Sequence, residues 1–141
     1  MPCFPLSRYS VAAVYFILAA SCSIFSEPTL DKLIAEKKYK EAIDYAEDKI
    51  PSSQRDAATW VELAQANEAT GNPEKSLACY LVAWRLDQSN YQAMLGAATV
   101  YNELGESEEA LNMAKKTLDK NFTAEASWQY AKACIALNRS V

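Results

Sequence analysis

Residues 57–90 read AATWVELAQANEATGNPEKSLACYLVAWRLDQSN, and this stretch decides the fold. Its first half carries a stripe of side chains at helical spacing, namely Trp60, Leu63, Ala64 and Asn67. The turn formers Gly-Asn-Pro at 71–73 interrupt the stripe. A second helical stripe follows, made of Leu77, Tyr80, Leu81, Ala83 and Trp84. The stretch therefore predicts two helices joined by a tight turn.

The same pattern returns after a shift of 34 residues, the period of the tetratricopeptide repeat, or TPR. The shift places Trp60 on Met94 and then on Trp128, and it places Gly71 on Gly105. The repeat signature is W-x2-L-G-x2-Y, then A-x3-F, then P. This chain has Trp60-x2-Leu63-Ala64-x2-Asn67, then Ser76-x3-Tyr80, then Gln88. From about Thr29 to its end, the chain therefore resembles the TPR family.

The resemblance implies an all-α protein built of αα-hairpins in a short right-handed superhelix. Residues 27–141 would form the TPR domain, with repeats at about 29–56, 57–90 and 91–124 and a capping helix at 124–138, seven helices in all. Lys37 stands where the later copies have glycine turns. Lys132 replaces the small residue found at Ala64 and Ala98, which indicates a solvent-facing outer helix that ends the array. A piece of a longer array is the alternative.

The core of such an array combines small residues, which let helices approach, with large ones that fill the gaps between them. Stacking must supply the stability, because no single copy can bury its apolar face. The last helix carries Trp128, Ala131 and Ile135 at the apolar positions of the repeat. The predicted structural core comprises Trp60, Leu63, Ala64, Tyr80, Ala83, Ala98, Tyr101, Ala110 and Trp128.

The resemblance also implies a concave groove lined by the first helix of each repeat. The groove would be mildly acidic with apolar patches, and it lacks the basic residues with which some family members hold a carboxylate. It would suit a peptide with small apolar residues and a Lys or Arg. The alternative is that this face is merely solvated. The predicted groove residues are Val61, Glu62, Gln65, Glu68, Leu95, Thr99, Asn102, Glu103, Gln129 and Tyr130.

Composition argues against several functions. The chain of 141 residues has no histidine, which removes Ser-His-Asp and Cys-His catalysis and the commonest metal ligand. Its formal charge of −4, without a basic cluster, argues against nucleic acid. The cysteines at 3, 22, 79 and 134 fit no zinc or CxxC spacing. We therefore predict a protein that is not an enzyme, with no cofactor, no metal and no small-molecule substrate.

Residues 1–26 differ from the rest. The ten-residue apolar run Val11–Ala20 follows Arg8 and precedes small residues, which is the plan of a secretory signal peptide. The run is short for a membrane span, which needs about 20 residues, so export is favoured over a retained anchor.

The end of this segment, Leu18-Ala19-Ala20-Ser21-Cys22, resembles a bacterial lipobox, although Leu18 lies one position further from the cysteine than is usual. The resemblance implies lipidation of Cys22 and a membrane anchor. Ordinary cleavage nearby, for example after Ser23, is the alternative. Either way the predicted location is the bacterial envelope, as a periplasmic protein or an anchored lipoprotein.

These observations together predict an interaction scaffold or assembly factor that binds a protein or peptide through the groove. The alternative is a structural accessory subunit of a larger envelope complex, of the pilus or outer-membrane assembly type, that uses its convex face.

Overall fold

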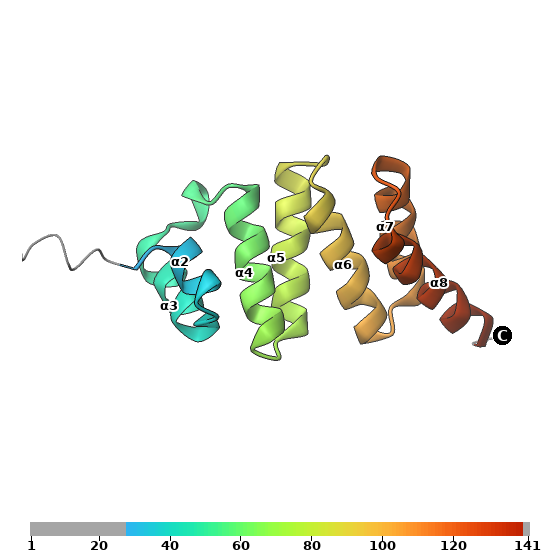
Figure 1. The fold of residues 1–141 in the computed structure, drawn as a ribbon, viewed down its shortest axis with the longest axis horizontal. Coiled ribbons are helices and arrows are strands. Elements are labelled where there is room, and N and C mark those ends of the chain that lie inside the picture. The colour runs from blue at the N-terminus through green and yellow to red at the C-terminus, as the bar shows by residue number, and fades with distance from the viewer. Residues whose placement is uncertain (1–27, 140–141) are drawn as a thin grey trace, which may run out of the picture.

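The computed structural model describes residues 28–139, so the predicted signal segment and Cys22 lie outside the described residues. The described part contains seven α-helices, one short 3-10 helix and no strand. The helices stand side by side in a row that begins with α2 and α3 and ends with α7 and α8 (Figure 1). Their bounds are α2 Leu30–Ala35, α3 Tyr39–Lys49, η1 Ser52–Gln54, α4 Ala57–Ala69, α5 Pro73–Leu86, α6 Tyr91–Leu104, α7 Ser107–Lys120 and α8 Ala124–Arg139.

The helices pack as antiparallel hairpins. Helix α4 pairs with α5 and α6 with α7, while α5 also packs on α6, and α8 rests on both α7 and α6. The first hairpin, α2 with α3, is the smallest because α2 has only 6 residues. The predicted all-α stack of αα-hairpins, a short right-handed superhelix, is confirmed.

The three hairpin turns sit one repeat apart and share one backbone conformation. Gly71 and Gly105 have φ of 77° and 80°, in the left-handed region that glycine tolerates. Lys37, at the equivalent position of the first hairpin, also takes a positive φ of 58°. The repeat geometry therefore holds even where the sequence does not supply glycine.

The first helices of the later repeats begin with side-chain caps. The Asp56 carboxylate accepts from the Thr59 backbone N–H at 2.8 Å, and the side-chain oxygen Oδ1 of Asn90 accepts from the Ala93 backbone N–H at 3.0 Å. At the start of α8 the Thr123 hydroxyl accepts from the Ala126 N–H at 3.2 Å. Each cap accepts from a backbone N–H group of the first turn that has no partner within the helix, and this fixes the residue at which the helix begins.

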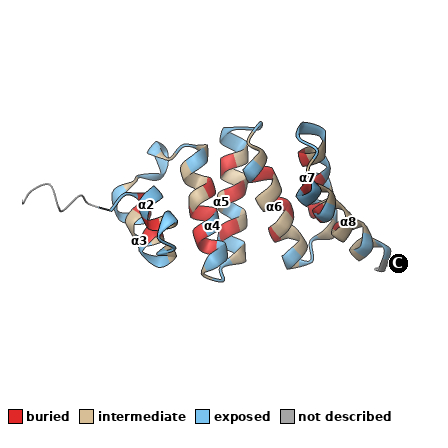
Figure 2. Ribbon diagram, viewed as in Figure 1, coloured by how far each residue is buried: buried red, intermediate tan, exposed pale blue. Residues whose placement is uncertain are grey.

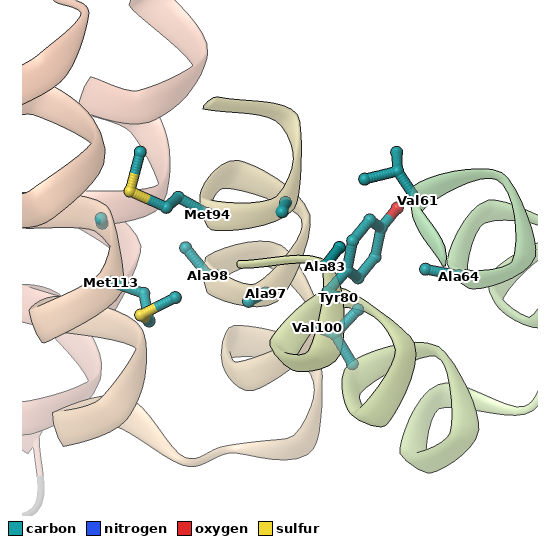
Figure 3. Close-up of a cluster of buried hydrophobic side chains, with 11 residues drawn as sticks. Val61, Ala64, Tyr80, Ala83, Met94, Ala97, Ala98, Val100 and Met113 are labelled. Carbon is teal, nitrogen blue, oxygen red and sulfur yellow. The ribbon is translucent and has the colours of Figure 1, made fainter. Parts of the chain in front are cut away.

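The core forms two clusters along the row. The larger one joins α4, α5, α6 and α7, and it includes Tyr80, Met94 and Val100 (Figure 3). The smaller one joins α2 and α3 to α4 through Leu63. Buried residues follow the facing sides of neighbouring helices (Figure 2). Of the predicted core, the buried members are Leu63, Ala64, Tyr80, Ala83, Ala98 and Ala110, and the half-buried ones are Trp60 and Tyr101.

The prediction that Trp128 belongs to the core is wrong, because its side chain is 59% exposed. Ile135, two turns further along α8, is 52% exposed. In the repeat register both residues lie where a second helix would pack against α8, and the described residues supply no such helix. The outer side of α8 therefore exposes two large apolar residues beside Lys132, the residue from which a solvent-adapted helix was predicted.

A search of the described helices finds none with the length and apolar character that crossing a membrane requires.

Candidate functional site

The first helices α2, α4, α6 and α8 share one face of the row, which we call the first-helix face. Interactions between neighbouring first helices define it. The Asp31 carboxyl on α2 lies close enough to Glu62 on α4 to help raise the pKa of the Glu62 carboxyl. Further along, the Asn102 amide on α6 donates to the backbone and side-chain oxygens of Gln129 on α8, both at 3.0 Å. These contacts link α2 to α4 and α6 to α8 on the first-helix face.

A hollow of about 580 Å³ lies on this face beside α4. Two of its lining residues, Gln65 and Glu68, belong to the predicted groove. Tyr39, from the start of α3, and Tyr80, from α5, complete the wall together with Ala69. Sequence reasoning missed the contribution of the second helices, because the family pattern assigns the groove to first helices alone.

Tyr80 connects the core to this hollow. Its ring is buried between α4 and α6, with Val61 and Ala64 on one side (Figure 3). The ring lies directly against Gly96, where an added Cβ would collide with three of its carbons. The hydroxyl donates to Glu68 Oε2 at 3.1 Å. The absence of a side chain at Gly96 thus lets a core aromatic reach the first-helix face.

Sequence reasoning also missed Gly96. The available signal was a glycine inside a helix that is otherwise rich in alanine, where glycine costs about 1 kcal/mol relative to alanine. Such a residue indicates close approach of another group, and here that group is the Tyr80 ring.

The carboxylates of the first-helix face sit in an unfavourable environment. Burial raises the pKa of Glu62 above its usual range, and the neighbouring Asp31 and Asp56 raise it further. Glu68 is exposed, yet partial desolvation raises the pKa of its carboxyl, as does the nearby Glu103, while the hydrogen bond from the Tyr80 hydroxyl lowers it. Desolvation and like charges both disfavour an ionised carboxylate. The folded protein therefore holds these two negative charges at a cost to its stability.

This arrangement predicts a pH-dependent effect of replacing Glu62. A carboxyl whose pKa is raised by folding adds stability below its unfolded pKa, near 4.5, and that contribution is lost as pH rises through the folded pKa. We therefore expect Glu62→Gln to be more stable than the wild type at pH 7, with the difference shrinking as pH falls toward 4. Urea denaturation midpoints at both pH values measure this. Gln65→Ala changes an exposed neighbour that does not titrate, so its difference in midpoint from the wild type should be the same at both pH values. A Glu62→Gln difference that is equal at both pH values would contradict the prediction.

Comparison by sequence finds no matching family model and no matching curated protein. Comparison by structure does find relatives of the fold. The crystal structure of MamA aligns with a TM-score of 0.56 at 16% identity, covering 92% of this chain and 87% of that one. The crystal structure of PcrH in complex with the chaperone binding region of PopB aligns with a TM-score of 0.58 at 19% identity, covering 80% of this chain and 98% of that one. Both are TPR-like repeat proteins.

The fold is a TPR-type helical repeat. Within this TPR-type array, the predicted groove residues divide by burial. Gln65, Glu68 and Glu103 are exposed, whereas the half-buried residues are Glu62, Leu95, Thr99, Asn102 and Tyr130.

Two residues predicted to line the groove do not face it. Val61 is 3% exposed and belongs to the larger core cluster. Gln129 is also 3% exposed, and its side chain donates to Glu125 at 2.8 Å while accepting from Asn102. Val61 packs in the core cluster that includes Tyr80 of α5, and Gln129 is hydrogen-bonded to Asn102 of α6. These contacts remove both residues from the accessible surface. Gln65, one turn beyond Val61 along α4, and Glu68, two turns beyond it, stay exposed.

Proposed function

We propose that this protein is a protein–protein interaction module that holds a segment of a partner on the first-helix face. The observation that carries the proposal is the hollow beside α4, in which the Glu68 carboxylate accepts from the Tyr80 hydroxyl at 3.1 Å. Glu62 lies half-buried on the same helix, and desolvation and acidic neighbours raise the pKa of both carboxyls. Perturbed groups of this kind gather at functional sites because a ligand, rather than the fold, relieves their cost. A cationic side chain from a partner would do so here.

The chemistry of the face defines the expected partner segment. The hollow beside α4 combines the Glu68 carboxylate with two tyrosines and an alanine. A lysine or arginine can pair with Glu68, and small apolar side chains can pack on the aromatic walls. The partner is therefore expected to present a short basic segment with small apolar residues. Its approach would be favoured by the net charge of −4.

The likeness to PcrH supports this proposal at the level of architecture. That structure contains a partner, the chaperone binding region of PopB. A TPR-type array of similar length thus accommodates a segment of another protein. The acidic character of the face is a property of this chain's own residues.

Site-specific photo-crosslinking in the native host tests the proposal. One probe replaces Gln65, which is exposed in the hollow, and a matched control replaces Lys115, which is exposed on the second helix α7. A discrete adduct from Gln65 alone is the expected result, and its mass identifies the partner. Adducts from Lys115 alone would instead support an accessory subunit that is held by its convex face. Silence at both positions would contradict binding on either face.

Charge removal on the first-helix face should weaken that complex. We expect the double variant Glu62→Gln and Glu68→Gln to bind the crosslinked partner about tenfold more weakly, or roughly 1.4 kcal/mol. Glutamine keeps the shape of the side chain and an oxygen that accepts from Tyr80, so the loss of affinity measures the effect of removing the negative charge. Isothermal titration calorimetry with the purified partner measures it. Glu47→Gln, an exposed carboxylate on α3, provides the control, and an equal loss there would indicate a general effect of net charge.

We further propose that the protein acts in the bacterial envelope, where Cys22 is lipidated. Support comes from the signal-like segment and the lipobox-like residues before the cysteine. Acyl chains contribute about 0.8 kcal/mol per buried CH₂, so they would hold the array at a membrane surface. Cys22→Ala is expected to shift gel mobility and to release the protein from the membrane fraction. Unchanged mobility and unchanged fractionation would rule out the lipoprotein, and Cys79→Ala is the matched control.

A further inference from the structure

A second hollow, of about 380 Å³, lies where the second helices α5 and α7 end. Both helices pack on α6, and a buried methionine of α6 contributes to the hollow. We call it the α5–α7 hollow, and it shares no lining residue with the hollow beside α4. Its lining residues are Trp84, Gln88, Met94, Lys116, Asp119 and Lys120.

The repeat register shows how the corresponding junction is occupied one repeat earlier, between α3 and α5. A shift of 34 residues relates Met94 to Trp60 and Ser89 to Arg55. The Trp60 ring packs against both core clusters, and the Arg55 guanidinium lies 4.9 Å from the centre of that ring. Two carbonyl oxygens at the end of α3 accept from Arg55, at 2.7 and 2.9 Å. An aromatic ring and a cation thus occupy this earlier junction, where the hollow measures only about 200 Å³.

The later junction lacks both of these groups. Met94 places a narrow, unbranched side chain where the earlier repeat has an indole. Ser89, which takes the place of Arg55, turns back to the Asp87 carboxylate, to which its backbone N–H donates at 2.9 Å and its hydroxyl at 2.6 Å. The connection 87–90 is also shorter than the connection 50–56 of the earlier junction. The chain therefore leaves this junction more open than the one before it.

The charge around the α5–α7 hollow is opposite in sign to that of the whole chain. The Lys116 ammonium lies 4.6 Å from the centre of the Trp84 ring, in a cation–π contact. Lys120, one turn further along α7, is exposed on the same helix. Asp119 is the acidic member of the lining, so two lysines stand against one aspartate in a chain of formal charge −4. This hollow therefore favours an anionic group.

We propose that the α5–α7 hollow binds a segment of a partner protein that presents an aromatic residue beside acidic residues. The aromatic ring packs on Met94 and Trp84 and takes the place that the Trp60 ring holds one repeat earlier. Methionine sulfur makes favourable contacts with aromatic rings, and the hollow falls in the size range of binding pockets, about 300–1,000 Å³. A flanking Asp or Glu pairs with Lys116 or Lys120.

The chemistry of the hollow favours this occupant over two others. A second copy of this chain offers Phe122, which is 82% exposed, but Lys120 precedes it by two residues and no acidic residue adjoins it. That copy would therefore bring a lysine to a hollow already lined by lysines. An anionic membrane surface pairs with the lysines but leaves Met94 and Trp84 without an aromatic partner. The inference does not depend on the function proposed for the first-helix face, whose expected segment is basic.

An NMR titration of the protein with three acetylated pentapeptides, DEFED, DEAED and KKFKK, provides the test. We expect DEFED to shift the Trp84 indole N–H signal and the Met94 methyl signal saturably. It should bind at least tenfold more tightly than either of the other peptides, because one lacks the aromatic ring and the other has the wrong charge. The indole signals of Trp60 and Trp128 are controls within the same spectra and should not move.

Charge variants locate the binding. Lys116→Glu and Lys120→Glu should each weaken DEFED at least tenfold, and Lys120→Glu, at an exposed position, should leave the thermal midpoint unchanged. Lys75→Glu makes the same charge change at an exposed position of α5 outside the hollow, so it should bind as the wild type does. Equal binding of DEFED and DEAED, or an equal loss in Lys75→Glu, would overturn the proposal.

Two further measurements separate the other occupants. Without saturable peptide binding, co-sedimentation with phosphatidylglycerol vesicles that Lys120→Glu abolishes would overturn the proposal in favour of a membrane surface. A dimer in analytical ultracentrifugation that Phe122→Ser dissociates would overturn it in favour of a second copy. The expected results are a monomer and no binding to the vesicles through Lys120.

Discussion

Replacing Trp60 with alanine is expected to lower the free energy of unfolding by about 3–5 kcal/mol, as truncation of a large packed aromatic does. Trp60 packs against both core clusters, so it links α2 and α3 to the rest of the array. The Arg55 guanidinium lies 4.9 Å from the centre of the Trp60 ring. Arg55 also donates to the Ala46 carbonyl at 2.7 Å and to the Ile50 carbonyl at 2.9 Å, at the end of α3. Loss of the ring would therefore loosen the first hairpin as well as leave a cavity.

Trp128 provides a matched control for this prediction. It is the same residue type at the same position of the repeat, two periods later, but its side chain is largely exposed. We expect Trp128→Ala to change stability by no more than about 0.5 kcal/mol, as is usual for exposed positions. Urea denaturation followed by circular dichroism measures both variants. Equal losses in the two variants would show that repeat position, rather than the neighbouring second helix, decides burial.

The contrast between these tryptophans shows what a repeat period can and cannot predict. The 34-residue register predicts where helices begin and end, because turn and cap residues act locally. The turns at Gly71 and Gly105 and the Thr123 cap lie where the sequence indicates. Burial, however, depends on which neighbour covers a position. Trp128 has the register of a core residue, but among the described residues no second helix covers it.

The sequence predicted the candidate site only in part, as it did the core. Gln65 and Glu68, which the register assigns to the groove, are exposed on α4 and line the hollow, while their role in binding stays a prediction. It could not show that Val61 packs into the core, since a position between two stacked helices and a position beside a groove have the same spacing. It could not show the raised pKa of Glu62 either, because that shift arises first from burial in the folded array and then from Asp31, which is far away in the sequence.

The position of Tyr80 in the hollow depends on Gly96, and this dependence gives the second large expected effect. In a helix interior, glycine to alanine ordinarily stabilises by about 1 kcal/mol. Here the new Cβ would collide with the Tyr80 ring, and overpacking a core costs about 1–3 kcal/mol. We expect Gly96→Ala to lower the free energy of unfolding by up to about 2 kcal/mol, measured by urea denaturation. A variant more stable than the wild type would contradict the close approach of the ring.

A double-variant cycle with Tyr80→Ala isolates the cause. Without the ring, Gly96→Ala should be neutral or stabilising, so the two substitutions should couple by about 0.5–3 kcal/mol. The cycle also has a readout at the first-helix face. The Tyr80 hydroxyl donates to Glu68 and holds down the pKa of that carboxyl, so a displaced ring should raise the pKa of Glu68 further. An NMR titration of Glu68 in Gly96→Ala that matches the wild type would mean that the ring has not moved. A shift would establish that a glycine with no contact to the hollow controls the charge within it, through one core aromatic.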